Sequence, residues 1–216
     1  MPEPINKTHS TPAGVVVEYF ESLRWLAKSA VEAPEDHQAR RIAAMAVIMA
    51  VNAVEVFLNL WFRVVATERN DCAQEAQFAH DLAKRISLEQ KLTTWPTRHL
   101  QANLDLRHGP GKAFVELKRV RNSIVHFESS HDTVHTGTAI LHGLADTTHY
   151  DGLTAASADE ALTIAENLVI EIFRLAGFDN ATVDHAATVW IGKGTKAESD
   201  SVPQRVATWV APHVQR

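Results

Sequence analysis

Two side chains with complementary chemistry stand five positions apart in the segment Arg121-Asn122-Ser123-Ile124-Val125-His126. Histidine is a residue type that can act as a general acid or a general base at physiological pH. The arginine stays charged, and its planar guanidinium group matches the oxygens of a phosphate. Where the substrate supplies its own nucleophile, such a pair needs no metal ion. The segment therefore combines a group that can transfer protons with a group that can bind an anion such as phosphate.

The segment closes an expected helix over residues 112–125, and helix geometry decides which of its side chains can meet. At about 100° per residue, Asn122 and His126 share a face, and Arg119 lies on that face too. Arg121 lies about 140° away from His126 if the helix is regular. Three alternatives stay open: the helix ends early, Arg119 shares the anion-binding role, or a cleft closes around the helix end.

Apolar residues elsewhere recur at spacings of three and four, which is typical of amphipathic helices. The pattern predicts an all-α bundle of about five or six helices. An irregular insertion, either a loop or a small hairpin over residues 127–153, should precede the last long helix. The other expected helices cover residues 14–31, 36–67, 71–85, 87–95 (ending before Pro96) and 157–177, with a short one over 180–190.

The long helix that begins near Asp36 is apolar almost all round, but three polar residues, Asn52, Glu55 and Asn59, share one of its faces. Burying such groups without partners is unfavourable. We therefore expect them to face a polar cleft, a partner subunit or backbone groups that they cap. A membrane-spanning role for residues 42–62 is the weaker interpretation, because these polar groups interrupt the apolar run.

The composition divides the chain into a flexible lead over residues 1–12, a helical domain over 13–178 and an extension of uncertain order over 179–216. The net charge of −5 means that any nucleic-acid binding must come from a local basic patch. The single cysteine, Cys72, cannot form an internal disulfide, which fits a reducing cytoplasm. His131 and His135 are a weak metal pair without a third ligand, so no metal or other cofactor is expected.

The segment from Arg121 to His126 resembles the signature of the HEPN superfamily, in which an arginine and a histidine are separated by four to six residues, usually with a polar residue after the arginine. Ser87-Leu88-Glu89-Gln90-Lys91-Leu92, the linker after it and the helix Phe114 to His126 look like the same stretch in bacterial HEPN proteins. The long alanine-rich helix and the late helix over 157–177 extend the resemblance to roughly residues 15–178.

The resemblance implies a helical bundle that forms a homodimer, with the motifs of both subunits at a shared cleft. Many members are metal-independent endoribonucleases, often toxins or defence proteins, with an antitoxin or another protein as partner. Carried over, His126 would move protons during attack by the RNA 2′-hydroxyl, and Arg121 would stabilise the charge on phosphorus. Arg119 and Asn122 would support them, and Asn52, Glu55 and Asn59 would form the opposite polar wall.

Two other interpretations of the motif remain. HEPN folds also serve as non-catalytic modules that bind a nucleotide or a protein, which the acidic net charge favours slightly. In the plainest interpretation, His126 interacts with a helix C-terminus, where a positive charge is favourable, and Arg121 pairs with an acidic neighbour.

Overall fold

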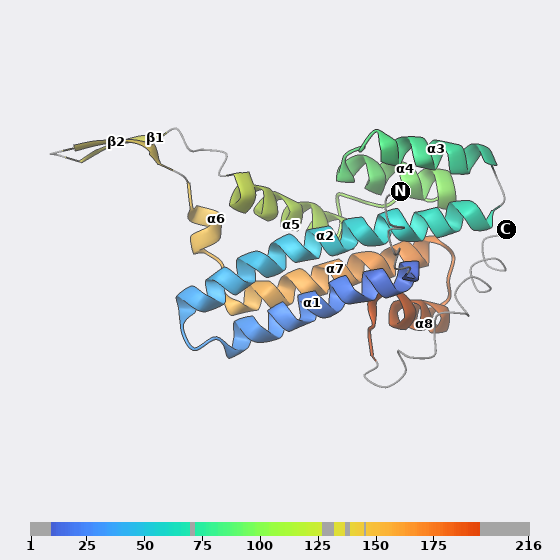
Figure 1. Cartoon of the computed structure of the whole chain (residues 1–216), viewed down its shortest axis with the longest axis horizontal. Helices are drawn as coiled ribbons and strands as arrows, with labels where there is room; N and C mark the ends of the chain where they lie inside the picture. Colours follow the sequence, from blue (N-terminus) through green and yellow to red (C-terminus); the bar gives the residue numbers. More distant parts are fainter. Residues whose placement is uncertain (1–9, 70–71, 127–131, 137–138, 145, 195–216) are drawn as a thin grey trace, which may run out of the picture.

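The computed structural model describes residues 10–69, 72–126, 132–136, 139–144 and 146–194 (Figure 1). These residues form eight helices and one hairpin, so the all-α prediction is confirmed, while the count of five or six helices was too low. The elements are α1 (Pro12–Glu32), α2 (Asp36–Glu68), α3 (Cys72–Ala83), α4 (Leu88–Leu100), α5 (Gly109–His126), β1 (Asp132–Thr136), β2 (Ala139–Leu144), α6 (Thr148–Asp151), α7 (Ala155–Leu175) and α8 (Asn180–Ile191).

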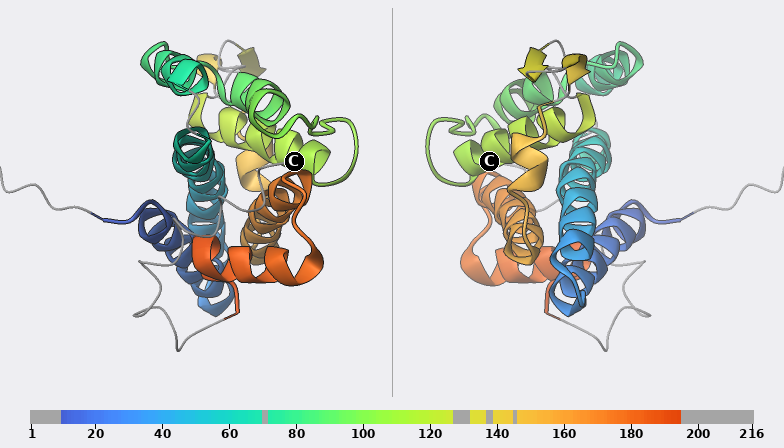
Figure 2. Two further views of the ribbon diagram at one scale, coloured as in Figure 1. Left: turned by 90° about the vertical axis from the view of Figure 1, so that its right-hand side faces the viewer. Right: turned by 90° about the vertical axis from the view of Figure 1, so that its left-hand side faces the viewer.

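Three long helices, α1, α2 and α7, lie side by side and form the centre of the molecule (Figures 1 and 2). Helix α5 crosses α2 and α7, and α8 packs below α1 and α7. The pair α3 and α4 covers the C-terminal half of α2. Each long helix thus buries its apolar stripe against two or more neighbours, as a bundle requires.

Helix α2 is the central element of the core. It contains neither glycine nor proline, and its buried side chains include the stacked pair Phe57 and Trp61. Phe173 of α7 meets both rings edge-on, and Trp190 of α8 meets Phe57. By length and composition α2 would also pass as a membrane span, but the core helix of a soluble bundle passes the same test. The absence of a membrane partner stays a prediction.

Helix α8 confirms the short helix expected over residues 180–190, and its apolar side chains belong to the same core. Buried residues therefore continue to Ile191, past the boundary drawn at residue 178. Polar contacts hold the end of α8 in place. The Arg24 guanidinium of α1 donates one hydrogen bond to the Ile191 carbonyl oxygen and another to Glu166 Oε1 of α7, the latter at 2.8 Å. Lys193 lies 3.2 Å from the other Glu166 oxygen.

Two prolines behave differently from expectation. The helix that should stop before Pro96 continues as α4 to Leu100, although a proline cannot donate the backbone bond of a regular turn. Pro96 is buried together with Trp95 and His99, so tertiary packing outweighs the lost bond. The helix expected from residue 112 begins earlier, as α5 at Gly109, although the glycines and proline of residues 109–111 usually interrupt a helix. A proline is tolerated in the first turn, and Gly111 is needed because an added Cβ would lie 2.2 Å from the Asp105 carbonyl oxygen.

The insertion contains a small antiparallel hairpin, in which Val134 pairs with Leu141 and Thr136 with Ala139. The hairpin is one of the two alternatives left open by the sequence. The four-residue helix α6 follows, held to α2 by an ion pair between Arg40 and Asp151 at 3.3 Å. Residues 1–9, most of the proposed lead, and 195–216, most of the proposed extension, lie outside the described part of the chain.

Candidate functional site

Helix α5 stays regular through His126, and this settles how the motif is arranged. Its buried stripe consists of Gly111, Phe114, Leu117 and Ile124. Arg121 stands four residues after Leu117 and three before Ile124, so its side chain leaves the helix on the face that packs against the bundle. Arg121 is half-buried, and its Nε is enclosed without a hydrogen-bond partner among the described residues.

The other face of the same turn carries Arg119, Asn122 and His126, which we call the α5 terminal face. Arg119 and His126 are exposed, and Asn122 is half-buried. Since the helix does not end early, that alternative is excluded. On this chain the arginine that shares a face with His126 is therefore Arg119, whereas Arg121 points toward the core-facing side.

The charges along α5 are only partly compensated. Lys112 lies 3.7 Å from Glu116, and Lys118 lies 3.2 Å from Glu89 of α4. Neither Arg119 nor Arg121 forms an ion pair within the described ranges. Arg119 therefore places a positive charge on the face of His126 that no described acidic residue compensates, in a protein whose net charge is −5. A local patch of this kind can attract an anion that the whole protein would repel.

The polar face of α2 does not act as one unit. Asn52 is exposed, and Glu55 accepts a hydrogen bond from Lys91 Nζ of α4 at 2.6 Å. The Oδ1 atom of Asn59 is buried and has no partner in the described structure. Glu55 is thus engaged by α4. The motif end of α5 instead lies toward the N-terminal half of α2 (Figure 1).

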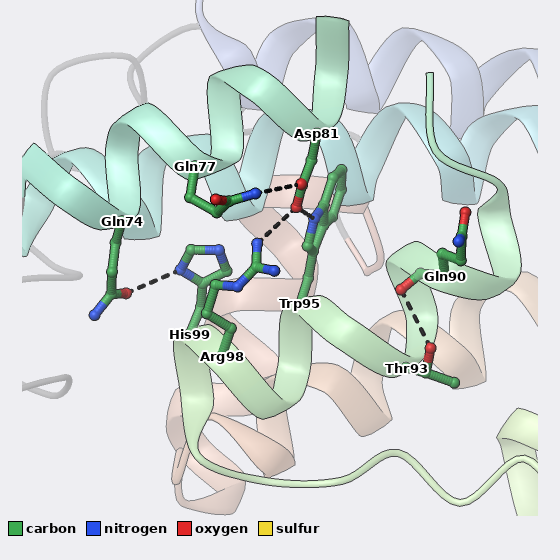
Figure 3. Close-up of polar contacts among 8 residues, drawn as sticks. All are labelled: Gln74, Gln77, Asp81, Gln90, Thr93, Trp95, Arg98 and His99. Atoms are coloured by element: carbon green, nitrogen blue, oxygen red, sulfur yellow. Dashed lines mark hydrogen bonds and ion pairs between the residues drawn. The ribbon is translucent and has the colours of Figure 1, made fainter. Parts of the chain in front are cut away.

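The structure shows a second polar group that the sequence did not reveal, between α3 and α4 (Figure 3). Asp81, only 6% exposed, is its centre. One carboxylate oxygen accepts from Gln77 at 2.9 Å, and the other accepts from Trp95 Nε1 at 3.1 Å and from Arg98 at 2.6 Å. We call these four residues the Asp81 cluster. The sequence signal was the spacing of Gln77 and Asp81 on one helix face, opposite Trp95 and Arg98 on another.

The electrostatics of the Asp81 cluster are those of a satisfied buried carboxylate. Burial raises the pKa of Asp81, but hydrogen bonds from Arg98, Gln77 and Trp95, together with the Arg98 charge, outweigh that effect, so the pKa lies below its ordinary value of 3.8. The carboxylate is charged at neutral pH, and three donors already occupy it. Such a group is suited to joining two helices, and poorly suited to binding a ligand.

Neighbouring side chains extend this cluster to α2. Lys91, which pairs with Glu55, lies with its Nζ 5.6 Å from the centre of the Trp95 ring. The His99 ring is fully buried between Phe62 and Phe78, and its Nδ1 lies 3.2 Å from Gln74 Oε1 (Figure 3). Polar groups thus connect α3, α4 and α2 in one continuous layer.

Comparison of the chain with family models, with curated proteins and with solved structures finds no match.

The described residues contain no group of three or more His, Cys, Asp or Glu side chains placed to hold a metal ion. His131 lies outside the described residues, and the structure describes only the backbone of His135, in β1. Of the two polar groups characterised above, the Asp81 cluster is closed and the α5 terminal face is open. The latter is the candidate functional site.

Proposed function

We propose that this protein is a HEPN-type endoribonuclease that cleaves RNA without a metal ion, and that the α5 terminal face contacts the scissile phosphate. The observation that carries the proposal is that the exposed His126 shares a helix face with the exposed Arg119, which has no acidic partner among the described residues. A histidine can transfer protons near neutral pH, and an arginine can bind phosphate oxygens in a bidentate manner.

In the proposed reaction the RNA supplies the nucleophile. His126 accepts the proton of a ribose 2′-hydroxyl, whose oxygen attacks the adjacent phosphorus. The bond from phosphorus to the 5′-oxygen breaks, and that oxygen takes a proton from His126 of a second copy of the chain or from water. The products are a 2′,3′-cyclic phosphate and a free 5′-hydroxyl. A guanidinium group stabilises the negative charge that develops on the phosphoryl oxygens.

The geometry refines which arginine takes that role. The resemblance assigns it to Arg121, but on a regular α5 the guanidinium that shares a face with His126 belongs to Arg119. We therefore propose Arg119 as the phosphate-binding residue of the same chain, assisted by Asn122. Arg121 remains the alternative, and its guanidinium would have to reach the phosphate although its side chain leaves the helix about 140° from His126.

The proposed enzyme is a homodimer. Val125, next to His126 on α5, is a large apolar side chain that is 45% exposed, and Met45 of the neighbouring helix α2 is 54% exposed. Exposed apolar groups from two adjacent helices favour contact with another apolar surface, and a second copy would place two His126 side chains together. A role as a toxin or defence effector, with an antitoxin as partner, is part of the same proposal.

The deciding experiment is RNA cleavage in excess EDTA by the wild-type protein and by the His126→Ala variant. We expect the wild-type protein alone to cleave, leaving 2′,3′-cyclic phosphate ends. Loss of a general acid or base lowers the rate by about 10²- to 10⁴-fold. His80→Ala, which removes an exposed histidine of α3, is the matched control and should cleave normally. Intact RNA after incubation with folded, dimeric wild-type protein would reject the enzyme.

The second candidate is a HEPN module that binds a nucleotide or a protein without cleaving RNA. One specific observation favours it: Arg121 and His126, the two signature residues, leave α5 on different faces. In this case nucleotides would raise the unfolding temperature of the wild-type protein. They would not raise that of Arg119→Ala, and RNA would remain intact with both proteins.

A further inference from the structure

A groove with an apolar floor lies far along α2 from the motif, and we call it the Trp190 groove. It has a volume of about 450 Å³ and lies between the start of α1, the C-terminal half of α2 and the end of α8. Pro12, Val15, Leu60, Val64 and Trp190 provide its apolar lining. A cavity of this size can accept several apolar side chains.

The rim of the groove carries one charge of each sign. Arg63 and Glu68, both on α2, line it, and neither forms an ion pair with another described residue. The natural occupant would therefore be amphipathic, with apolar side chains for the floor and both signs of charge at its edges.

We infer that the Trp190 groove is the docking site for the C-terminal segment of the same chain, residues 201–211. The described chain ends at Gly194, only four residues after Trp190. The six residues 195–200 can span at most about 20 Å when extended, which is enough to turn the chain back onto the groove. Tethering at this distance gives an effective concentration in the millimolar range, so weak contacts suffice.

The sequence of this segment matches the groove. Val202, Val206, Trp209 and Val210 are spaced four, three and one apart, which places them on one face of a helix. Ser201-Val202-Pro203-Gln204 has the Ser-x-x-Gln form of a capping box. The same form at Ser87 makes both capping bonds at the start of α4, so the sequence predicts a short amphipathic helix that ends before Pro212.

Apolar composition favours this segment over the N-terminal residues, although both carry charges of both signs. Asp200 and Arg205 flank its apolar face and provide partners for Arg63 and Glu68. Ser10, which follows residues 1–9 in the sequence, also lines the groove, but the large apolar side chains of residues 1–9 are limited to Met1 and Ile5. The groove needs a broad apolar face, and the C-terminal segment has one.

The test uses the chain's single cysteine, which the structure places well. Cys72 is exposed at the start of α3, four residues after Glu68 of the rim. A nitroxide label on Cys72 of the full chain should broaden the amide signals of residues 202–210 and the Trp209 indole signal. Reducing the nitroxide should restore these signals. Unbroadened signals from 202–210, or broadening confined to residues 1–9, would overturn the inference.

Two further samples separate the occupants. One sample mixes nitroxide-labelled chains without isotopes and isotope-enriched chains without the nitroxide, so that only the latter are observed. Broadening of residues 202–210 in this mixture would assign the groove to a second copy and overturn intramolecular docking. The Trp209→Ala variant should lose the broadening of the segment and unfold about 4 °C lower. Trp25→Ala, which removes an exposed indole from α1, is the control and should change neither. An unchanged broadening pattern in Trp209→Ala would also contradict the inference.

Discussion

The Asp81 cluster and the α5 terminal face both contain charged side chains near helix ends, but the charges of the cluster are buried and paired, whereas those of the terminal face are exposed. In the cluster, a buried carboxylate has three donors within 3.1 Å, contributed by two helices. On the terminal face, Arg119 and His126 are exposed and have no partner among the described residues. A buried charge must be paired because it has lost its contact with water, whereas an exposed charge is solvated and can bind a ligand. Buried, paired charges of the described structure therefore stabilise the fold, whereas exposed charges without a described partner are available for function.

The largest effect should come from removing the centre of the Asp81 cluster. In Asp81→Ala, Trp95 and Arg98 lose their acceptor inside the protein. Breaking a buried pair costs about 3–5 kcal/mol, and we expect about 3 kcal/mol because the Arg98 side chain is 29% exposed. Urea unfolding measures the loss. RNA cleavage at a temperature where the variant is folded should equal that of the wild-type protein. A cleavage defect at that temperature would show that the Asp81 cluster contributes to activity as well as to stability.

The next effect separates the two arginines of α5. Arg119→Ala should weaken RNA binding about tenfold, because a hydrogen bond to a charged group contributes about 1.5–3 kcal/mol, and should leave the unfolding temperature unchanged. Arg121→Met removes a half-buried guanidinium whose Nε has no partner, so its stability should not fall.

Fluorescence anisotropy with a labelled RNA compares these variants, and Arg107→Ala, an exposed arginine before α5, serves as control. If Arg121→Met lost RNA binding while Arg119→Ala retained it, the two assignments would have to be exchanged.

The Asp81 cluster also predicts how stability depends on pH. The pKa of Asp81 is lower in the folded protein than its ordinary value of 3.8. The carboxylate therefore contributes its full stability above pH 3.8, and the contribution is lost as the pH falls through the folded-state pKa. Wild type should exceed Asp81→Asn in free energy of unfolding near neutral pH, and the difference should shrink below pH 3.8. A difference independent of pH down to acid unfolding would contradict this account.

The smallest effect concerns the link between α4 and α5. Glu89 is exposed and lies 3.2 Å from Lys118. An exposed ion pair contributes less than about 1 kcal/mol. Glu89→Gln should therefore lower the free energy of unfolding by less than that amount, a loss that disappears at high salt. A loss as large as that of Asp81→Ala would show that the α5 region also depends on paired charges.

The sequence predicted most of the helices because their apolar residues follow the helical period. The capping box at Ser87 and the short helix over residues 180–190 were also readable, since local side-chain chemistry starts and stops a helix. Local rules failed at Pro96 and at Gly109. There, burial of Trp95 and the close approach of Gly111 to the Asp105 carbonyl outweighed the usual breakers.

Some properties of the candidate site were likewise predictable from the sequence, and others were not. Residue types and spacing alone identified Arg119, Asn122 and His126 as one face, because helix geometry is local. Spacing also placed Arg121 away from His126, but only the regular end of α5 decided that the divergence is real. The partner of Glu55 came from another helix, so no pattern within α2 could name Lys91.

The sequence by itself determined that the protein is helical, where the long helices run and which segment carries the motif. These properties depend on neighbours within a few positions along the chain. Only the tertiary structure decided that α4 continues through its proline, that Asp81 is buried among donors and that α8 completes the core. Those outcomes depend on contacts between residues far apart in sequence, whose energies no local pattern contains.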